Sequence, residues 1–442
     1  MDIAAPPKVE AAAPALDAGG RAVLWIFLFW QSTIVVEGPL RGALVELGQP
    51  NLLYARDLLV AGSVALALLT PAFSRAKFPA GLVLMGWLLV VHSCLGLMLS
   101  GTLFQRLFGV KIFMPLLFGV VVFPAIQRNM GLFTKAMAAF FAVTVVGVFA
   151  NEFVGQWPWE GLSYATAFGT VDATREWWMA GGARRLPGFA RASFDAAMII
   201  GLTGVVLLTR VRSFWLKALI AGAGFTAIVM TTSKGMVLAF AIASPWLTLG
   251  KRSDGSLRIG KSLALSLLLV TCLVPTVFMV VSVREDASGV PEILTSLWDR
   301  FSWMWPNAYS LVPNYFGALS GVGPGGIGGA LDYPQALGVP NAGDSIFVYF
   351  YVTFGLAGIV YLAFPLVALL QKTKGELEGS FAWIGLLIIA YGYGLSINMV
   401  EQAFFTSIFG LVFGAAFAAL QPRPSAAADR ALAESAYWST RK

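Results

Sequence analysis

The sequence predicts an all-α polytopic integral membrane protein with about 12 transmembrane helices and two long loops on one side of the membrane. The chain has 442 residues, of which 58% are hydrophobic and only 12% charged, and its mean hydropathy is +0.76. A water-soluble protein of this size could not bury so much apolar surface, so the bilayer must act as its solvent. Apolar runs of spanning length recur along the chain, and basic residues gather in every second connection between them.

The apolar runs give the positions of the helices. Most are long enough to cross the bilayer, and several are slightly short of that length. The two runs within 214–249 are joined by Thr231-Thr-Ser-Lys-Gly235, so they form either two spans or one long helix with a break. The expected helices cover 22–37, 52–73, 80–100, 109–126, 133–151, 194–210, 214–231, 235–249, 260–283, 345–370, 381–399 and 402–420.

The basic residues orient the chain. With the N-terminus inside, both tails and every inside connection carry Lys or Arg, including Arg75, Arg128, Arg210 and Lys372. This is the positive-inside pattern, and it places both termini in the cytoplasm. In a membrane protein this distribution says more than the net charge of +7. The expected organisation is a disordered cytoplasmic tail over 1–21, a single transmembrane domain over 22–420 with outside loops near 152–193 and 284–344, and a cytoplasmic tail over 421–442.

A glycine-rich stretch in the second outside loop needs a separate explanation. Gly321-Val-Gly-Pro-Gly-Gly-Ile-Gly-Gly329 contains the GxGxxG spacing of dinucleotide-binding loops. That fingerprint works only where a strand leads into the turn and a helix follows it. Pro313 before the stretch and Pro334 after it break any regular run, so the match is accidental. We expect instead a compact loop whose amides line a binding cavity.

Four pieces of the sequence resemble the superfamily of O-antigen ligases and O-antigen or exopolysaccharide polymerases. Their order and spacing carry the resemblance, which extends over about two thirds of the chain together with the number of apolar runs. The pieces are the GVGPGG turn followed by the segment Asp344–Gly358, the segment Arg185-Leu-Pro-Gly-Phe-Ala-Arg-Ala-Ser-Phe-Asp195, the break Thr231-Thr-Ser-Lys-Gly235, and Arg300 followed by Trp303 and Trp305.

The resemblance implies a GT-C-like membrane glycosyltransferase of the bacterial inner membrane, with its active site at the periplasmic face. It implies an undecaprenyl-pyrophosphate-linked oligosaccharide as substrate, with no metal or other cofactor. Asp344 and Ser345 stand where the ligases often have histidine and asparagine, which favours a polymerase. A ligase that transfers the glycan to another acceptor is the alternative. Expected partners are the lipid-linked oligosaccharide, membrane lipid, a chain-length regulator and export machinery, and no nucleic acid.

The transfer of a sugar from a lipid pyrophosphate needs cationic groups that neutralise the leaving group. Arginine suits phosphate because its guanidinium presents a fixed fork of donors. We therefore assign pyrophosphate binding to Arg185, Arg191, Lys234 and Arg300. The alternative for Lys234 is a side chain that reaches to the membrane interface, and for the arginines it is a solvated loop surface.

The acceptor hydroxyl needs a base, and Asp344 is the leading candidate. Its alternative role is to cap, together with Ser345, the helix expected from 345 onwards. A position at a helix start would also lower its pKa, which does not suit a general base. Glu401, at the outer junction of the last two spans, is the second candidate carboxylate.

Aromatic residues crowd both outside loops, where they form an interfacial belt or stack on sugars. For glycan binding we name Trp303 and Trp305, with Gly323 and Gly325 in the glycine turn. The only histidine, His92, lies within an apolar run and is expected to be a packing residue. With one histidine and no clustered acidic motif, a metal site is not expected.

A transporter or flippase of lipid-linked sugars is the rival from another functional class. Transporters bind near the midplane of the membrane, with broken helices in repeated halves and ionisable residues inside the bundle. Here the spans are nearly free of internal charge and the polar residues gather in the outside loops. The sequence therefore favours an enzyme.

Overall fold

The computed structural model describes residues 18–69, 79–99, 101–166, 169–172, 174, 184–281, 289–312, 315–332, 338–339, 341–371 and 377–420. The expected C-terminal tail over 421–442, and residues 1–17 of the expected N-terminal tail, lie outside this part of the chain. All ten residues predicted for the functional site are within it.

Fourteen long or apolar helices build the fold described here, and they agree with the predicted positions. A helix begins within six residues of each of the 12 expected starts. The helices are α1 (Ala18–Val35), α2 (Glu37–Glu46), α3 (Tyr54–Leu69), α5 (Pro79–Leu99), α6 (Leu103–Arg128), α7 (Met130–Val154), α8 (Ser193–Arg210), α9 (Phe214–Met230), α10 (Lys234–Leu249), α11 (Asp254–Val280), α15 (Ile346–Phe354), α16 (Leu356–Gln371), α17 (Leu377–Gly394) and α18 (Ala403–Leu420).

The helices have the length and the surface of a membrane bundle. Within the described residues, 7 helices are long and apolar enough to cross a membrane, or 8 if α1 and α2, which meet at 80°, form one bent span. Large apolar side chains remain exposed on the outside of the bundle, including Met98 at 82% and Trp215 at 80%. Such a surface is stable when lipid covers it. The chain is therefore a helical, multi-pass membrane protein.

The structure settles one open alternative and breaks one predicted helix. α9 and α10 are two helices, separated by a turn in which Thr232 has a φ of 59°. The helix predicted over 345–370 is interrupted at Gly355, where φ is 60°. A side chain at Gly355 would meet the Leu319 carbonyl at 2.4 Å, so the break lets the backbone of another segment approach.

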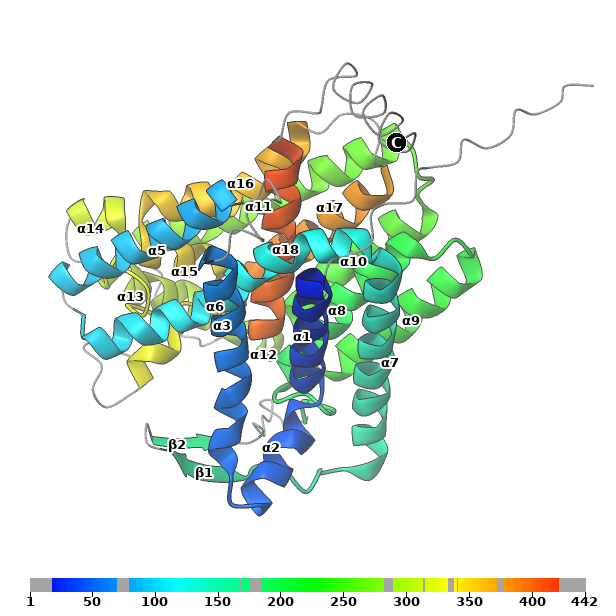
Figure 1. Ribbon diagram of the computed structural model, residues 1–442, viewed down its shortest axis with the longest axis horizontal. Helices are drawn as coiled ribbons and strands as arrows, with labels where there is room; N and C mark the ends of the chain where they lie inside the picture. The colour runs from blue at the N-terminus through cyan, green and yellow to red at the C-terminus, as the bar shows by residue number, and fades with distance from the viewer. Residues whose placement is uncertain are drawn as a thin grey trace, which may run out of the picture.

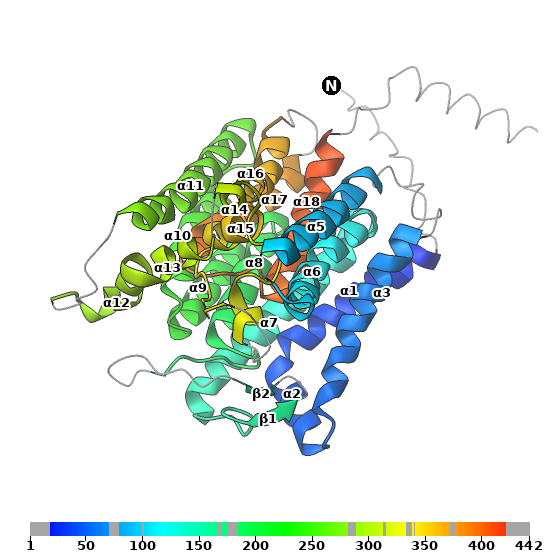
Figure 2. The ribbon, with the colours of Figure 1, turned by 90° about the vertical axis from the view of Figure 1, so that its left-hand side faces the viewer.

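The two predicted outside loops are partly folded, and Arg185 of the first interacts electrostatically with Arg300 of the second. The first contains an antiparallel hairpin of β1 (Ser163–Thr166) and β2 (Gly169–Asp172). Figure 2 shows this hairpin and α2 at the bottom of the molecule, with α12 beyond the end of α11 at the left. We call the bottom and left of this view, where these segments lie, the loop end. The second loop supplies α12 (Glu292–Asp299), the π-helical turn η2 (Arg300–Met304), α13 (Trp305–Ser310), α14 (Tyr315–Ser320) and the 3-10 turn η3 (Gly328–Asp332).

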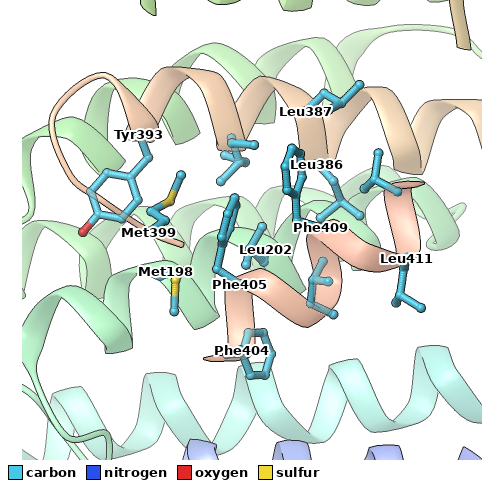
Figure 3. Close-up of a cluster of buried hydrophobic side chains, with 14 of the residues drawn as sticks. Met198, Leu202, Leu386, Leu387, Tyr393, Met399, Phe404, Phe405, Phe409 and Leu411 are labelled. Atoms are coloured by element: carbon cyan, nitrogen blue, oxygen red, sulfur yellow. The ribbon is translucent and has the colours of Figure 1, made fainter. Parts of the chain in front are cut away.

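α18 lies at the centre of the bundle, with α5 and α6 on one side and α7–α10 on the other (Figure 1). It packs backbone to backbone on α6, since a side chain at Gly119 would lie 2.1 Å from the Ser407 carbonyl oxygen. On its other side, Phe405 and Phe409 pack among side chains of α8 and α17 (Figure 3). Close approach of this kind is a main source of helix association in lipid, where the hydrophobic effect between helices is lost.

The glycine-rich stretch is buried against the helices and its amides are largely used within the protein. The amide of Val322 donates to the Val352 carbonyl at 2.8 Å, and that of Gly323 to the Thr353 carbonyl at 2.9 Å. Arg106 of α6 donates to the carbonyls of Pro324 and Gly96, each at 3.0 Å. The stretch is therefore a structural joint between α5, α6 and α15, a role that the sequence did not predict.

Replacing Gly325 by alanine should destabilise the protein much more than replacing Gly48. Both have positive φ, which costs an L-residue roughly 1–2 kcal/mol, but only at Gly325 would the new Cβ meet backbone, 1.9 Å from the Gln105 carbonyl oxygen. Nothing lies within 4 Å of the corresponding position at Gly48. Unfolding of each variant in detergent measures the difference. Equal losses would contradict the joint.

Candidate functional site

The centre of the site is an ion pair between Arg300 and Asp344. Arg300 is the first residue of η2, and its Nη2 lies 2.9 Å from Asp344 Oδ2. A second guanidinium nitrogen, Nη1, donates to Ser296 Oγ at 2.6 Å. The Arg300 and Asp344 side chains are 15% and 23% exposed, so a ligand can reach the pair. The structure thus joins a predicted pyrophosphate ligand directly to the predicted base.

The backbone at Asp344 is held in an unusual conformation. Its φ is 24°, a sparsely populated value for a residue with a side chain. The N-cap of α15 is Ser345, which makes no capping hydrogen bond through its side chain. Asp344 thus does not cap the helix, and its carboxylate is directed to Arg300 instead. Strain of this type persists only where surrounding contacts impose it.

Asn341 supplies those contacts. Its carbonyl accepts from the Gly328 amide at 2.8 Å, and its Oδ1 accepts from the Gly343 amide at 2.7 Å. Its Nδ2 donates to the Met304 carbonyl at 3.0 Å, at the end of the π-helical turn that begins with Arg300. Asn341 therefore ties together the segments that carry both partners of the ion pair. Its sequence signal, an asparagine between proline and glycine in a turn, was not used in the prediction.

Burial raises the pKa of Asp344 above its usual range, although the charge and hydrogen bond of Arg300 act in the opposite direction. The expectation that a helix start would lower this pKa is therefore wrong. Asp344 precedes the N-cap and accepts no capping amide, so the cost of placing its charge away from water dominates. A raised pKa is better suited to a general base.

Arg185 and Tyr393 interact with this pair. Arg185 interacts electrostatically with Arg300 and with Tyr393, and burial lowers its pKa. The Tyr393 hydroxyl, at the end of α17, hydrogen-bonds to the side chain of Ser233, the residue before Lys234. It also interacts electrostatically with Arg300 and Asp344. Figure 3 shows this hydroxyl pointing away from the apolar cluster beneath it. Tyr393 was missed because a tyrosine at the end of an apolar run has the same pattern as an interfacial anchor.

Arg191 belongs to a different cluster of charged residues. It acts on the buried carboxylate of Glu37, whose Oε1 accepts from Arg41 Nε at 2.7 Å and whose Oε2 lies 3.0 Å from Arg56 Nη2. Arg41 also donates to the Tyr164 hydroxyl at 2.6 Å, which links α2 to the hairpin. We call these residues the Glu37 cluster.

The sequence analysis did not detect this cluster. Glu37 was assigned to the end of an apolar span. Arg41 falls in the connection that follows, and Arg56 lies near the start of the next expected helix, 52–73. The available signal was the Glu-x-x-x-Arg spacing of Glu37 and Arg41, which places both on one helix face. Only the fold brings Arg56 and Arg191 to the same carboxylate.

Glu401 fixes the glycine-rich stretch. Its Oε1 accepts from the Gly329 amide at 2.7 Å. A side chain at Gly328 would lie 1.9 Å from the same oxygen, so Gly328 keeps space for the carboxylate. Glu401 thus bonds the backbone of η3, and Asp344 is paired with Arg300.

The residues predicted for glycan binding have different surroundings. The Trp303 side chain is 43% exposed, whereas Trp305 is fully buried between Phe278 and Phe301. Only the ring of Trp303 is accessible for stacking, and its role stays a prediction. Gly323 and Gly325 take part in the joint described above.

The structure confirms the packing role of His92. Its Nδ1 lies 2.7 Å from the Ser320 carbonyl, and its ring packs edge to face on Phe354 at 5.1 Å. His92 therefore joins α5 to the segment that enters the glycine-rich stretch.

Comparisons with known proteins do not assign the site. No family model matches the chain, and neither a curated protein nor a solved structure matches it. The chemistry must therefore be inferred from the residues of the site.

Replacing Glu37 by glutamine should lower the free energy of unfolding by about 3–5 kcal/mol, because it leaves buried guanidinium groups without their counter-charge. Asp57→Asn is the matched control. Asp57 is 29% exposed and pairs with Lys111 at 2.9 Å, so its loss should cost about 0–1 kcal/mol. Denaturant unfolding in detergent compares them. If Glu37→Gln cost no more than Asp57→Asn, the cluster would not be structural.

Proposed function

We propose that the chain is a bacterial polysaccharide polymerase, a metal-independent glycosyltransferase that joins undecaprenyl-pyrophosphate-linked repeat units. The observation that carries the proposal is the ion pair of Arg300 and Asp344, with Arg185 beside it, in a strained and accessible loop. A carboxylate of raised pKa next to several cations is what transfer from a lipid pyrophosphate to a hydroxyl requires.

The proposed enzyme has 12 transmembrane helices in a GT-C-like arrangement, lies in the inner membrane and has both termini in the cytoplasm. The agreement of the helices with the 12 predicted ranges supports this topology. Arg185 of the first segment predicted to be periplasmic interacts electrostatically with Arg300 of the second, which supports a shared periplasmic site.

In the proposed reaction the acceptor hydroxyl attacks the anomeric carbon of the donor sugar. A carbon–oxygen bond forms between the sugars, the bond from the anomeric carbon to the pyrophosphate oxygen breaks, and the lipid pyrophosphate leaves with the bonding electrons. Asp344 takes the hydroxyl proton. Arg185, Arg300 and Lys234 stabilise the charge that develops on the leaving group.

We infer that Arg300 acts both on the carboxylate base and on the leaving group. Two of its nitrogens contact Asp344 and Ser296, while its buried Nε makes no hydrogen bond within the described residues. A phosphate oxygen is a suitable acceptor for that donor, because hydrogen bonds between charged groups are the strong ones. The same guanidinium can therefore hold the carboxylate and contact the leaving group.

Asp344→Asn should slow polymerisation in cells roughly 10²–10⁴-fold, the contribution of a general base, while the protein remains at its normal level. The measurement is the pool of lipid-linked glycan in a strain lacking the protein and complemented with each variant, resolved by length and by membrane face. Asp254→Asn, an exposed carboxylate at the start of α11, is the control that should restore long chains.

In the strain that carries Asp344→Asn, we expect single repeat units to accumulate on the periplasmic face. Long chains that remain on the carrier would identify a ligase instead. Units trapped on the cytoplasmic face would indicate a flippase and contradict enzymatic transfer altogether.

Arg300→Gln should move the acidic limb of the pH–rate profile to higher pH. Activity requires the ionised carboxylate, so the rate falls as the pH drops through the pKa of Asp344. Arg300 lowers that pKa, and its removal leaves burial unopposed. Rates of the purified enzyme on lipid-linked repeat units give the profile, and Arg258→Gln, an exposed residue of α11, should leave the limb in place. A limb that stays or moves to lower pH after Arg300→Gln would exclude Asp344 as the titrating base.

A further inference from the structure

A cavity outside the proposed active site opens on the flank of the bundle. It has a volume of about 240 Å³ and lies between α1, α2, the 3-10 turn η1 (Pro50–Leu53) and α3. Figure 1 shows these helices side by side at the lower edge of the molecule. Its walls are almost entirely apolar, and the one charged side chain that lines it is Arg56. The apolar lining includes Phe29, Leu40, Leu44, Leu52 and Leu59.

The cavity faces outwards, towards the surface that lipid covers. Phe29 and Leu52 are 58% and 57% exposed, and Leu59 is 44% exposed. An apolar hollow that faces lipid is most stable when an apolar chain fills it. Its volume lies somewhat below the roughly 300–1,000 Å³ of sites that enclose a whole ligand. It therefore suits part of one acyl chain whose remainder stays in the bilayer.

Arg56, which lines the cavity, has two hydrogen-bond donors that make no hydrogen bond within the described residues. Its Nη2 contacts Glu37 at 3.0 Å, and its Nε lies 3.7 Å from Asp57 Oδ1, which is too long for a hydrogen bond. Both Nε and Nη1 are buried without a hydrogen-bond partner in the part of the chain described. Leaving such donors unsatisfied costs about 1–3 kcal/mol each, and more for a charged group.

The charges around Arg56 favour an anion. Within the described residues, three cationic groups form ion pairs with two carboxylates, those of Glu37 and Asp57. A phosphodiester would bring one negative charge and oxygen acceptors to this excess of cations. The cationic groups are those of Arg41, Arg56 and Lys111.

We propose that this cavity binds an anionic phospholipid of the membrane, with the phosphate on the Nε and Nη1 of Arg56 and one acyl chain along the apolar wall. The combination of a cationic head site and an apolar cavity open to the bilayer matches an amphiphile, and neither part alone does. The proposal does not depend on glycosyl transfer, since the cavity is built by α1–α3 while the Arg300–Asp344 pair lies in the second loop. The bound lipid would hold α3 against α1 and α2 and balance the Glu37 cluster.

The test uses the purified full-length protein in detergent with four probes. Dioleoylphosphatidylglycerol carries both parts of the amphiphile, dioleoylphosphatidylcholine has no net charge, dioleoylglycerol has no phosphate, and glycerol 3-phosphate has no chains. Native mass spectrometry gives the occupancy of each probe, and the unfolding temperature gives its effect on stability. The variants are Arg56→Gln, which removes the donors, and Ala55→Trp, which fills the cavity and keeps Arg56. Arg258→Gln is the control at an exposed arginine.

Phosphatidylglycerol should bind and raise the unfolding temperature more than the other three probes. Arg56→Gln and Ala55→Trp should each weaken this binding about tenfold or more, the loss expected for charge-assisted hydrogen bonds or for the buried chain. Arg258→Gln should leave it unchanged. If Arg56→Gln does not fold, Ala55→Trp alone decides.

Three results would overturn the proposal. Equal binding of phosphatidylglycerol and dioleoylglycerol would mean ordinary lipid contact without recognition of phosphate. Equal effects of phosphatidylglycerol and glycerol 3-phosphate would mean an anion site without a lipid. Undiminished phosphatidylglycerol binding by a folded Arg56→Gln or Ala55→Trp variant would place the lipid elsewhere.

Discussion

The arrangement of the site depends on the close seating of the glycine-rich stretch on the helix bundle. Its backbone lies so near α6 and α15 that side chains at Gly321 or Gly325 would overlap main-chain atoms. From this joint the contacts continue outwards, because Gly328 bonds Asn341 and Asn341 holds Gly343 beside Asp344. In a membrane protein such irregular backbone is tolerated only where protein groups satisfy its polar atoms, and here helix carbonyls and Arg106 do so.

The polar chemistry of the loop end is divided between two clusters that one short segment connects. Arg185 stands with Arg300 and Asp344, whereas Arg191 stands with Glu37. Six peptide steps separate the two arginines, so their Cα atoms are at most about 20 Å apart. Between them Gly188, with φ of 60°, donates its amide to Asn151 Oδ1 at 3.1 Å, which anchors the segment on α7. A ligand that moves one of these arginines therefore also acts on the segment that carries the other.

The sequence predicted the helices well because apolar runs and the positive-inside pattern both follow directly from the bilayer. It also identified Asp344 and Arg300, yet it could not pair them, since 43 residues of loop with no periodic pattern lie between. The breaks at Thr232 and Gly355 depend on tertiary contacts that no local pattern encodes. Arg185 and Arg191 were assigned one role because arginine suits phosphate, and the fold adds that Arg185 interacts with Arg300 and Arg191 with Glu37.

In the proposed glycosyl transfer, Arg300 and Asp344 act as one unit. A double-mutant cycle of Arg300→Gln and Asp344→Asn, read out as the rate at which the purified protein joins lipid-linked repeat units, tests this most directly. We expect strong coupling, in which the double variant is no slower than the slower single variant. Losses that simply add would mean that the two residues act independently, and the ion pair would not be the centre of the site.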